Sequence, residues 1–158
     1  MILPALLLVP ALVAAAPAPP AAAVATLLDD WHLAAAQADE TRYFGYLADE
    51  AVFLGTDATE RWDKAGFRAF AHPFFARGKA WSFRAVRRTI SFAAGGEVAF
   101  FDEDLDTPNL GPCRGSGVLE RRQGAWKILH YNLAVPIPNP LMDEVKHRIA
   151  AHLEAARP

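Results

Sequence analysis

The chain has 158 residues, with 16 basic and 18 acidic side chains and a formal net charge of −2. This length suits one globular domain. The near-balanced charge lacks the positive excess that binding to a phosphate backbone requires, so nucleic acid is not an expected partner. The single cysteine, Cys113, excludes an internal disulfide, a CxxC zinc site and an iron–sulfur cluster.

The N-terminus reads as a targeting segment, because no charged residue occurs from Met1 to Leu28. Residues 2–16 form an apolar run that is short for a membrane span and fits the hydrophobic region of a secretory signal peptide. We expect a signal peptide over residues 1–23, with cleavage after Ala23 or alternatively Ala25. The protein would then be exported, periplasmic or secreted, without a stable membrane span after cleavage. The first residues lack Lys and Arg, so an uncleaved anchor or a cytosolic protein with an Ala/Pro tail stays an alternative.

The next segment predicts two helices and a small hairpin. Thr26 is a candidate N-cap for a helix over residues 26–38, whose buried face contains Leu28, Trp31 and Ala35. Asp39 would cap a short second helix. Residues 51–54 read as a strand, a turn follows, and residues 60–62 read as its short partner strand.

A third helix is expected after Asp63, which is a good N-cap. Its core-facing stripe is expected to consist of Phe67, Phe70 and Phe74. Pro73 should bend or end this helix, and Gly78 is a stop signal.

The remainder is rich in strands, at residues 81–93, 98–105, 114–122 and 125–135. The first of these changes its alternation phase between Phe83 and Val86, which predicts a bulge and a strongly curved sheet. Asn139 and Pro140 open a final helix with an apolar stripe of Leu141, Val145, Ile149 and Leu153. The order predicts an α+β fold in which helices cover one face of a curved antiparallel sheet, with a C-terminal helix added.

Four stretches carry a resemblance to a known family: residues 48–57, residues 60–62, residues 114–119 and the Trp-x-Ile-x-His strand at residues 126–133. Together they resemble the SnoaL-like branch of the nuclear transport factor 2-like superfamily over residues 24–139, with residues 140–158 as a helical extension. The resemblance implies a cone-shaped fold with a pocket in the cone and frequent dimerisation through the sheet. It implies no single chemistry, since similar folds serve as cyclases, isomerases, dehydratases, hydrolases and binding modules.

Glu103 is the first candidate for chemistry. Strand alternation places it with Ala99, Phe101 and Leu105 on the more apolar, inward face. A carboxyl group in an apolar cone acquires a raised pKa, as a general acid or base near neutral pH requires. The alternative is a structural ion pair with an inward arginine such as Arg114.

His130 is the second candidate. It shares a strand face with Trp126, Ile128 and Asn132, so His130 and Asn132 are expected in the pocket. His130 could carry a proton either way, and Asn132 could hold a carbonyl or an oxyanion. The alternative is a hydrogen-bonded core pair. The other face of this strand is also apolar, which predicts a homodimer.

The expected ligand contacts are Tyr43, Trp62, Arg114, Asn132 and Trp126. No metal site is expected: an acidic run at residues 102–106 lacks the glycine and glutamate of an EF-hand, and no HExxH motif occurs. Two hypotheses result. The protein binds a small, mostly apolar metabolite and uses Glu103 and His130 for cofactor-free acid–base chemistry, or it is a non-catalytic binding or dimerisation module.

Overall fold

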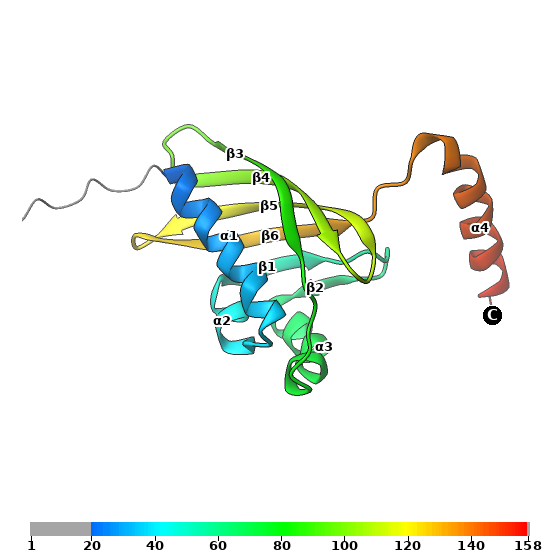
Figure 1. The fold of residues 1–158 in the computed structure, drawn as a ribbon, viewed down its shortest axis with the longest axis horizontal. Coiled ribbons are helices and arrows are strands. Elements are labelled where there is room, and N and C mark those ends of the chain that lie inside the picture. The colour runs from blue at the N-terminus through cyan, green and yellow to red at the C-terminus, as the bar shows by residue number, and fades with distance from the viewer. Residues whose placement is uncertain (1–19, 158) are drawn as a thin grey trace, which may run out of the picture.

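The computed structural model describes residues 20–157 (Figure 1). Along the chain, two helices are followed by two strands, a third helix, four more strands and a C-terminal helix that a short 3-10 turn precedes. The helices are α1 (Pro20–Ala36), α2 (Glu40–Gly45), α3 (Lys64–Ala76), the short 3-10 helix η1 (Asn139–Leu141) and α4 (Met142–Ala155). The strands are β1 (Leu47–Leu54), β2 (Arg61–Asp63), β3 (Arg84–Phe92), β4 (Val98–Thr107), β5 (Gly111–Arg122) and β6 (Ala125–Ala134).

The strands form one curved, open sheet in the order β2-β1-β6-β5-β4-β3. All neighbours are antiparallel except β1 and β6, which run parallel, so the expected antiparallel sheet needs this one correction. The α+β class and the curvature are confirmed. One sheet face packs under α1, α2 and α3, and we call it the inner face; the other is the outer face.

The N-terminal helix is longer than the sequence indicated. α1 begins at Pro20, so Thr26 is not its N-cap. Leu28, Trp31 and Ala35 are buried on one face as expected. Of the predicted signal peptide, residues 1–19 lie outside the described residues, and Ala23, the predicted cleavage position, lies in the first turn of α1.

Two helix caps follow the sequence closely. The Asp39 side chain accepts a hydrogen bond from the Arg42 amide at 3.0 Å, and Asp63 accepts one from the Gly66 amide at 2.7 Å. Each satisfies an amide that the first helical turn leaves without a partner. These caps fix where α2 and α3 begin.

The buried face of α3 differs from the expected one. Its core residues are Phe67, Ala71 and Phe75, spaced by four, whereas Phe70 and Phe74 are 44% and 36% exposed. The helix also continues through Pro73 to Ala76, so the proline does not end it. Gly78 does end the segment, at a φ of 70° that favours glycine.

Three register shifts shape the sheet; one lies between Leu47 and Val52 where β1 pairs with β6, and the other two concern β3 and the β5–β6 pair. The shift in β3 lies between Ala85 and Arg87, where the sequence predicted a bulge. In the β5–β6 pair, Val118 pairs with His130, but Leu119 pairs with Ile128. β6 therefore has one extra residue, Leu129, which inverts its alternation from that point.

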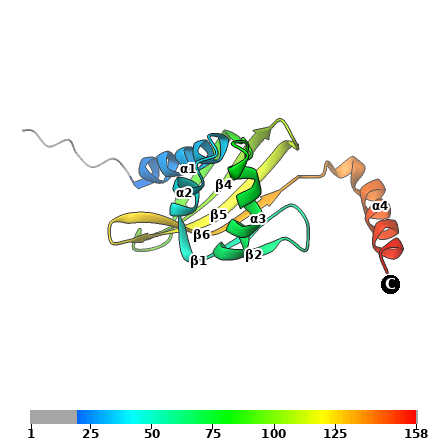
Figure 2. The same ribbon diagram turned by 90° about the horizontal axis from the view of Figure 1, so that it is seen from below.

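The C-terminal helix stands away from the sheet (Figures 1 and 2). α4 follows the extended segment at residues 136–138 and has no buried residue. Its predicted stripe is exposed: Leu141, Ile149 and Leu153 are 48%, 52% and 61% exposed. Within residues 20–157, no helix has the length and apolar character needed to cross a membrane.

Candidate functional site

A cavity of about 170 Å³ opens between the helices and the inner face of the sheet. This volume is close to that of cavities that hold a single aromatic ring, about 150 Å³. Its wall is predominantly aromatic, and its aromatic members are Trp31, Tyr43, Phe53, Trp62, Phe67, Phe70, Trp81, Phe83 and Tyr131. The polar wall groups include His32 on α1 and the Tyr131 hydroxyl on β6.

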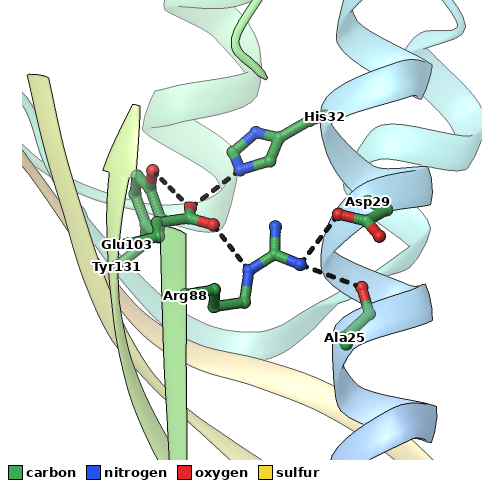
Figure 3. A network of polar contacts seen from close by, with 6 residues as sticks. All are labelled: Ala25, Asp29, His32, Arg88, Glu103 and Tyr131. Carbon is green, nitrogen blue, oxygen red and sulfur yellow. Dashed lines mark hydrogen bonds and ion pairs between the residues drawn. The ribbon is translucent and has the colours of Figure 1, made fainter. Parts of the chain in front are cut away.

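Glu103 lies behind this wall, fully buried on the inner face of β4 (Figure 3). His32 Nε2 lies 2.8 Å from Glu103 Oε1, and the Tyr131 hydroxyl donates to the same oxygen at 3.3 Å. Arg88 Nε donates to the other oxygen at 2.8 Å. The sequence prediction that Glu103 faces inward is therefore confirmed.

The partners of Glu103 decide its charge. Burial by itself raises the pKa of this carboxyl, but the hydrogen bonds from His32 and Arg88 and the charge of Arg88 outweigh it and hold the pKa below its usual value. Glu103 is thus an ionised acceptor at neutral pH. This corrects the expectation of a raised pKa and agrees with the alternative of an ion pair between Glu103 and an inward arginine, which is Arg88.

The charge of Glu103 fixes the proton on His32. A carboxylate can only accept, so the proton in the 2.8 Å contact belongs to His32 Nε2. His32 Nδ1 forms no hydrogen bond with the described residues, although the side chain is 94% buried. The ring also lines the cavity, which leaves Nδ1 as the nitrogen that can exchange a proton with a ligand.

The Tyr131 hydroxyl is a second polar group at the cavity. Burial and the neighbouring negative charge of Glu103 raise its pKa well above the usual value. The phenol therefore stays protonated and donates. Its 3.3 Å bond to Glu103 is long, so a ligand oxygen can compete for that proton.

Arg88 connects the carboxylate to α1. Its Nη1 donates to the Asp29 side chain at 2.8 Å and to the Ala25 carbonyl at 3.2 Å (Figure 3). The Arg88 side chain is 91% buried, and its Nη2 has no partner in the part of the chain that the structure describes. A planar guanidinium with several donors suits this bridge between helix and sheet.

A glycine makes room for the cluster. A Cβ at Gly115 would overlap the Tyr131 hydroxyl and would lie 2.9 Å from Glu103 Oε1. Gly115 lies opposite Glu103 on the neighbouring strand β5, and opposite Leu133 of β6 on its other side. Its position is therefore next to the Glu103 side chain. Only glycine leaves the tyrosine free to approach Glu103.

The structure does not bring Glu103 and His130 together. Beyond the extra residue Leu129, Tyr131 and Leu133 face inward, whereas His130 and Asn132 lie on the outer face. The predicted pair assumed uninterrupted alternation along β6, and the bulge invalidates that assumption. Asn132 instead borders a shallow hollow beside the β1–β2 loop.

Arg114 also lies on the outer face. It is exposed, and its cross-strand neighbours are Asp104 and Ala134. The expected pairing of Glu103 with Arg114 is wrong, since Glu103 is paired with Arg88.

The three aromatic candidates differ in whether they line the cavity. Tyr43 and Trp62 line the cavity. Trp126 faces inward and is buried, but it packs against Phe92 with ring centroids 5.9 Å apart and is not part of the cavity wall.

Sequence reasoning missed His32, Arg88 and Tyr131. His32 follows Leu28 by four residues on the buried face of α1, so a polar residue in an apolar stripe was the available signal. Arg88 lies directly opposite Glu103 in the β3–β4 register, which the sequence did not fix. Within residues 20–157 no group of three His, Cys, Asp or Glu side chains could hold a metal ion.

Comparisons with known proteins agree with this architecture. Residues 24–138 match the family described as "SnoaL-like domain". No curated protein matches the chain.

Several solved structures share the fold at low sequence identity. An NTF2-like protein of unknown function from Pseudomonas putida KT2440 is 17% identical, with a TM-score of 0.61 over 77% of this chain and 91% of that chain. A candidate ketosteroid isomerase from Parabacteroides distasonis is 14% identical, with a TM-score of 0.59 over 73% and 86%. A candidate scytalone dehydratase from Novosphingobium aromaticivorans is 9% identical, with a TM-score of 0.62 over 74% and 84%.

Proposed function

The chain belongs to the SnoaL-like domain family, and from that premise we propose that it binds a small, mostly aromatic metabolite and moves a proton on it through His32. The observation that carries the proposal is the arrangement of one side chain. His32 is held at Nε2 by the buried carboxylate of Glu103, and its Nδ1 has no partner among the described residues at an aromatic cavity. Isomerase, cyclase or dehydratase chemistry without a cofactor is the corresponding reaction class.

The roles follow from the contacts. Neutral His32 accepts a proton from the ligand at Nδ1, and the ionised Glu103 at Nε2 stabilises the imidazolium that forms. The Tyr131 hydroxyl donates to the ligand oxygen on which negative charge develops. His32 then returns its proton at another atom of the ligand. The apolar wall strengthens each of these interactions by excluding water.

The alternative proposal is a binding module without turnover. Its support is that Glu103 is already compensated by Arg88 and His32, as a purely structural carboxylate would be. Both proposals place the ligand in the same cavity. They differ in whether His32 exchanges a proton with it.

A deuterium-exchange experiment separates the two. The full chain is incubated in D₂O with phenylacetone, a ketone with one aromatic ring and acidic C–H groups beside its carbonyl, and exchange is followed by ¹H NMR. Binding is followed in parallel by quenching of tryptophan fluorescence, because Trp31, Trp62 and Trp81 line the cavity. We expect catalysed exchange, lowered at least ~100-fold by His32→Asn.

Two further variants make the result specific. His147→Asn alters an exposed histidine on α4 and should leave exchange unchanged. His130→Asn tests the residue that the sequence favoured, and the structure predicts little effect. Binding without exchange would support the module instead, and absence of both would contradict the cavity proposal for ligands of this class.

Export and self-association remain part of the proposal. The apolar run at residues 2–16 supports a signal peptide. The outer face supports a homodimer, since three apolar side chains and one histidine lie in register across four neighbouring strands: Phe100, Val118, His130 and Val52.

A further inference from the structure

Aromatic side chains on and beside α3 are exposed around the cavity mouth. Phe70 is 44% exposed and stacks on Trp62 with centroids 4.8 Å apart, while Phe74 is 36% exposed and contacts both Phe70 and Trp81. Leu110, 44% exposed, adds an apolar side chain from the β4–β5 loop. We call this set the apolar rim: Trp62, Phe70, Phe74, Trp81 and Leu110. All its members except Phe74 also line the cavity.

The segment that carries most of the rim is basic. Residues 60–79 contain five basic and two acidic side chains, although the whole chain has a net charge of −2. Two of the five are paired, Lys64 with Asp49 and Arg68 with Glu40. Arg61, Arg77 and Lys79 have no ion-pair partner among residues 20–157.

The basic and aromatic groups are in contact. The Arg77 guanidinium carbon lies 5.0 Å from the Phe74 ring centroid, and Lys79 follows directly after the glycine that ends α3. The two acidic residues of the segment are engaged locally: Asp63 caps α3, and Glu60 accepts from the Asp57 amide. Arg77 and Lys79 therefore add positive charge beside the apolar rim at the end of α3. Glu60 adds one carboxylate to the cavity wall, and Arg61, which alternates with Trp62 along β2, lies on the other face.

We propose that the apolar rim docks on the surface of an anionic lipid bilayer. Tryptophan and phenylalanine side chains partition into the interfacial region, and unpaired Arg and Lys side chains are attracted to anionic headgroups. Contact with a second copy through a two-fold axis suits the rim less, because the same basic side chains would face each other. Docking would open the cavity mouth toward the bilayer, so that an apolar ligand enters from the lipid; this last step rests on the proposed function, but the docking does not.

Vesicle binding tests the proposal on the full chain without any ligand. Vesicles of equal parts phosphatidylglycerol and phosphatidylcholine are compared with pure phosphatidylcholine vesicles by co-sedimentation and by quenching of tryptophan fluorescence with brominated lipids. We expect binding to the anionic vesicles, weakened by salt and by loss of the anionic lipid. Phe70→Ser with Phe74→Ser should reduce affinity at least ~10-fold, and Arg77→Glu with Lys79→Glu by a similar factor.

Matched variants identify the surface. Val86→Ser, at a 61% exposed position on the edge strand β3, should bind vesicles like the wild type. His32→Asn should also bind normally, which separates this test from that of the proposed function. Absent binding to anionic vesicles, or wild-type binding by the Phe70/Phe74 variant, would overturn the proposal. If a rim variant binds vesicles like the wild type but changes the molecular mass measured by light scattering, the rim would be a contact between copies. That result would also overturn the proposal.

Discussion

At the scale of single residues, the buried carboxylate of Glu103 organises the site. It is fully buried, yet it contacts two basic side chains and a phenol from three different elements. Such a charge is tolerated because its partners neutralise it and satisfy its oxygens. His32 and Arg88 in turn depend on it for their orientation.

Glu103→Gln should therefore destabilise the domain strongly. The substitution removes the buried carboxylate that Arg88 contacts and leaves the guanidinium only the exposed Asp29, so the expected loss is about 3–5 kcal/mol in the free energy of unfolding. Urea denaturation followed by far-UV circular dichroism measures it. The neighbour Asp102→Asn, exposed on the same strand, is the control and should change stability by less than about 0.5 kcal/mol. A loss below about 1 kcal/mol for Glu103→Gln would contradict the network.

The stability difference between wild type and Glu103→Gln should also depend on pH. The pKa of Glu103 is lowered in the folded state, so its contribution is fully present above the unfolded value of 4.5 and is lost as the pH falls through the lowered folded value. The stability difference between wild type and Glu103→Gln should shrink over that acidic window. A difference that stays constant from pH 7 to pH 3 would contradict it.

At the scale of elements, sequence reasoning located most helices and strands and the inward face of β4, but not the face that the second half of β6 presents. Asp39 and Asp63 were predicted as caps because a short acceptor before an apolar run has a local cause. The bulge in β3 left a visible change of phase. The bulge at Leu129 in β6 left none, because residues 126–133 are apolar in both phases. The candidate site was therefore half predicted: Glu103, Tyr43 and Trp62 reach it, but His130 and Asn132 do not.

The elements also explain why His32 and Arg88 escaped prediction. Both meet Glu103 only through long-range packing, of α1 on the sheet and of β3 beside β4. The helical periodicity placed His32 on a buried face, but no residue near it in the sequence indicated that its partner is Glu103. Sequence periodicity gives faces and caps, whereas contacts between distant elements depend on register.

At the scale of the whole molecule, the fold separates three surfaces. The inner face of the sheet forms the cavity wall, the α3 side carries the apolar rim, and the outer face carries the row defined by Phe100, Val118, His130 and Val52. Phe100 in this row is 50% exposed. Exposed apolar residues in register across a sheet favour burial against another copy.

Val118→Asp should convert the proposed homodimer into monomers. Val118 lies at the centre of the outer row between Phe100 and His130, where a charge would be buried without a partner. Size-exclusion chromatography with light scattering measures the mass, and Glu97→Lys, at an exposed position outside the row, is the control. A monomeric wild type, or an unchanged dimer in Val118→Asp, would exclude this interface.

The state of His32 tests the central claim most directly. Long-range ¹H–¹⁵N NMR at pH 8, with the resonance assigned by its absence in His32→Asn, reports which ring nitrogen carries the proton. The structure predicts the proton on Nε2, facing Glu103, and a free Nδ1 whose resonance shifts when phenol is added. A proton on Nδ1, or an Nδ1 resonance that is indifferent to an aromatic ligand, would contradict the account.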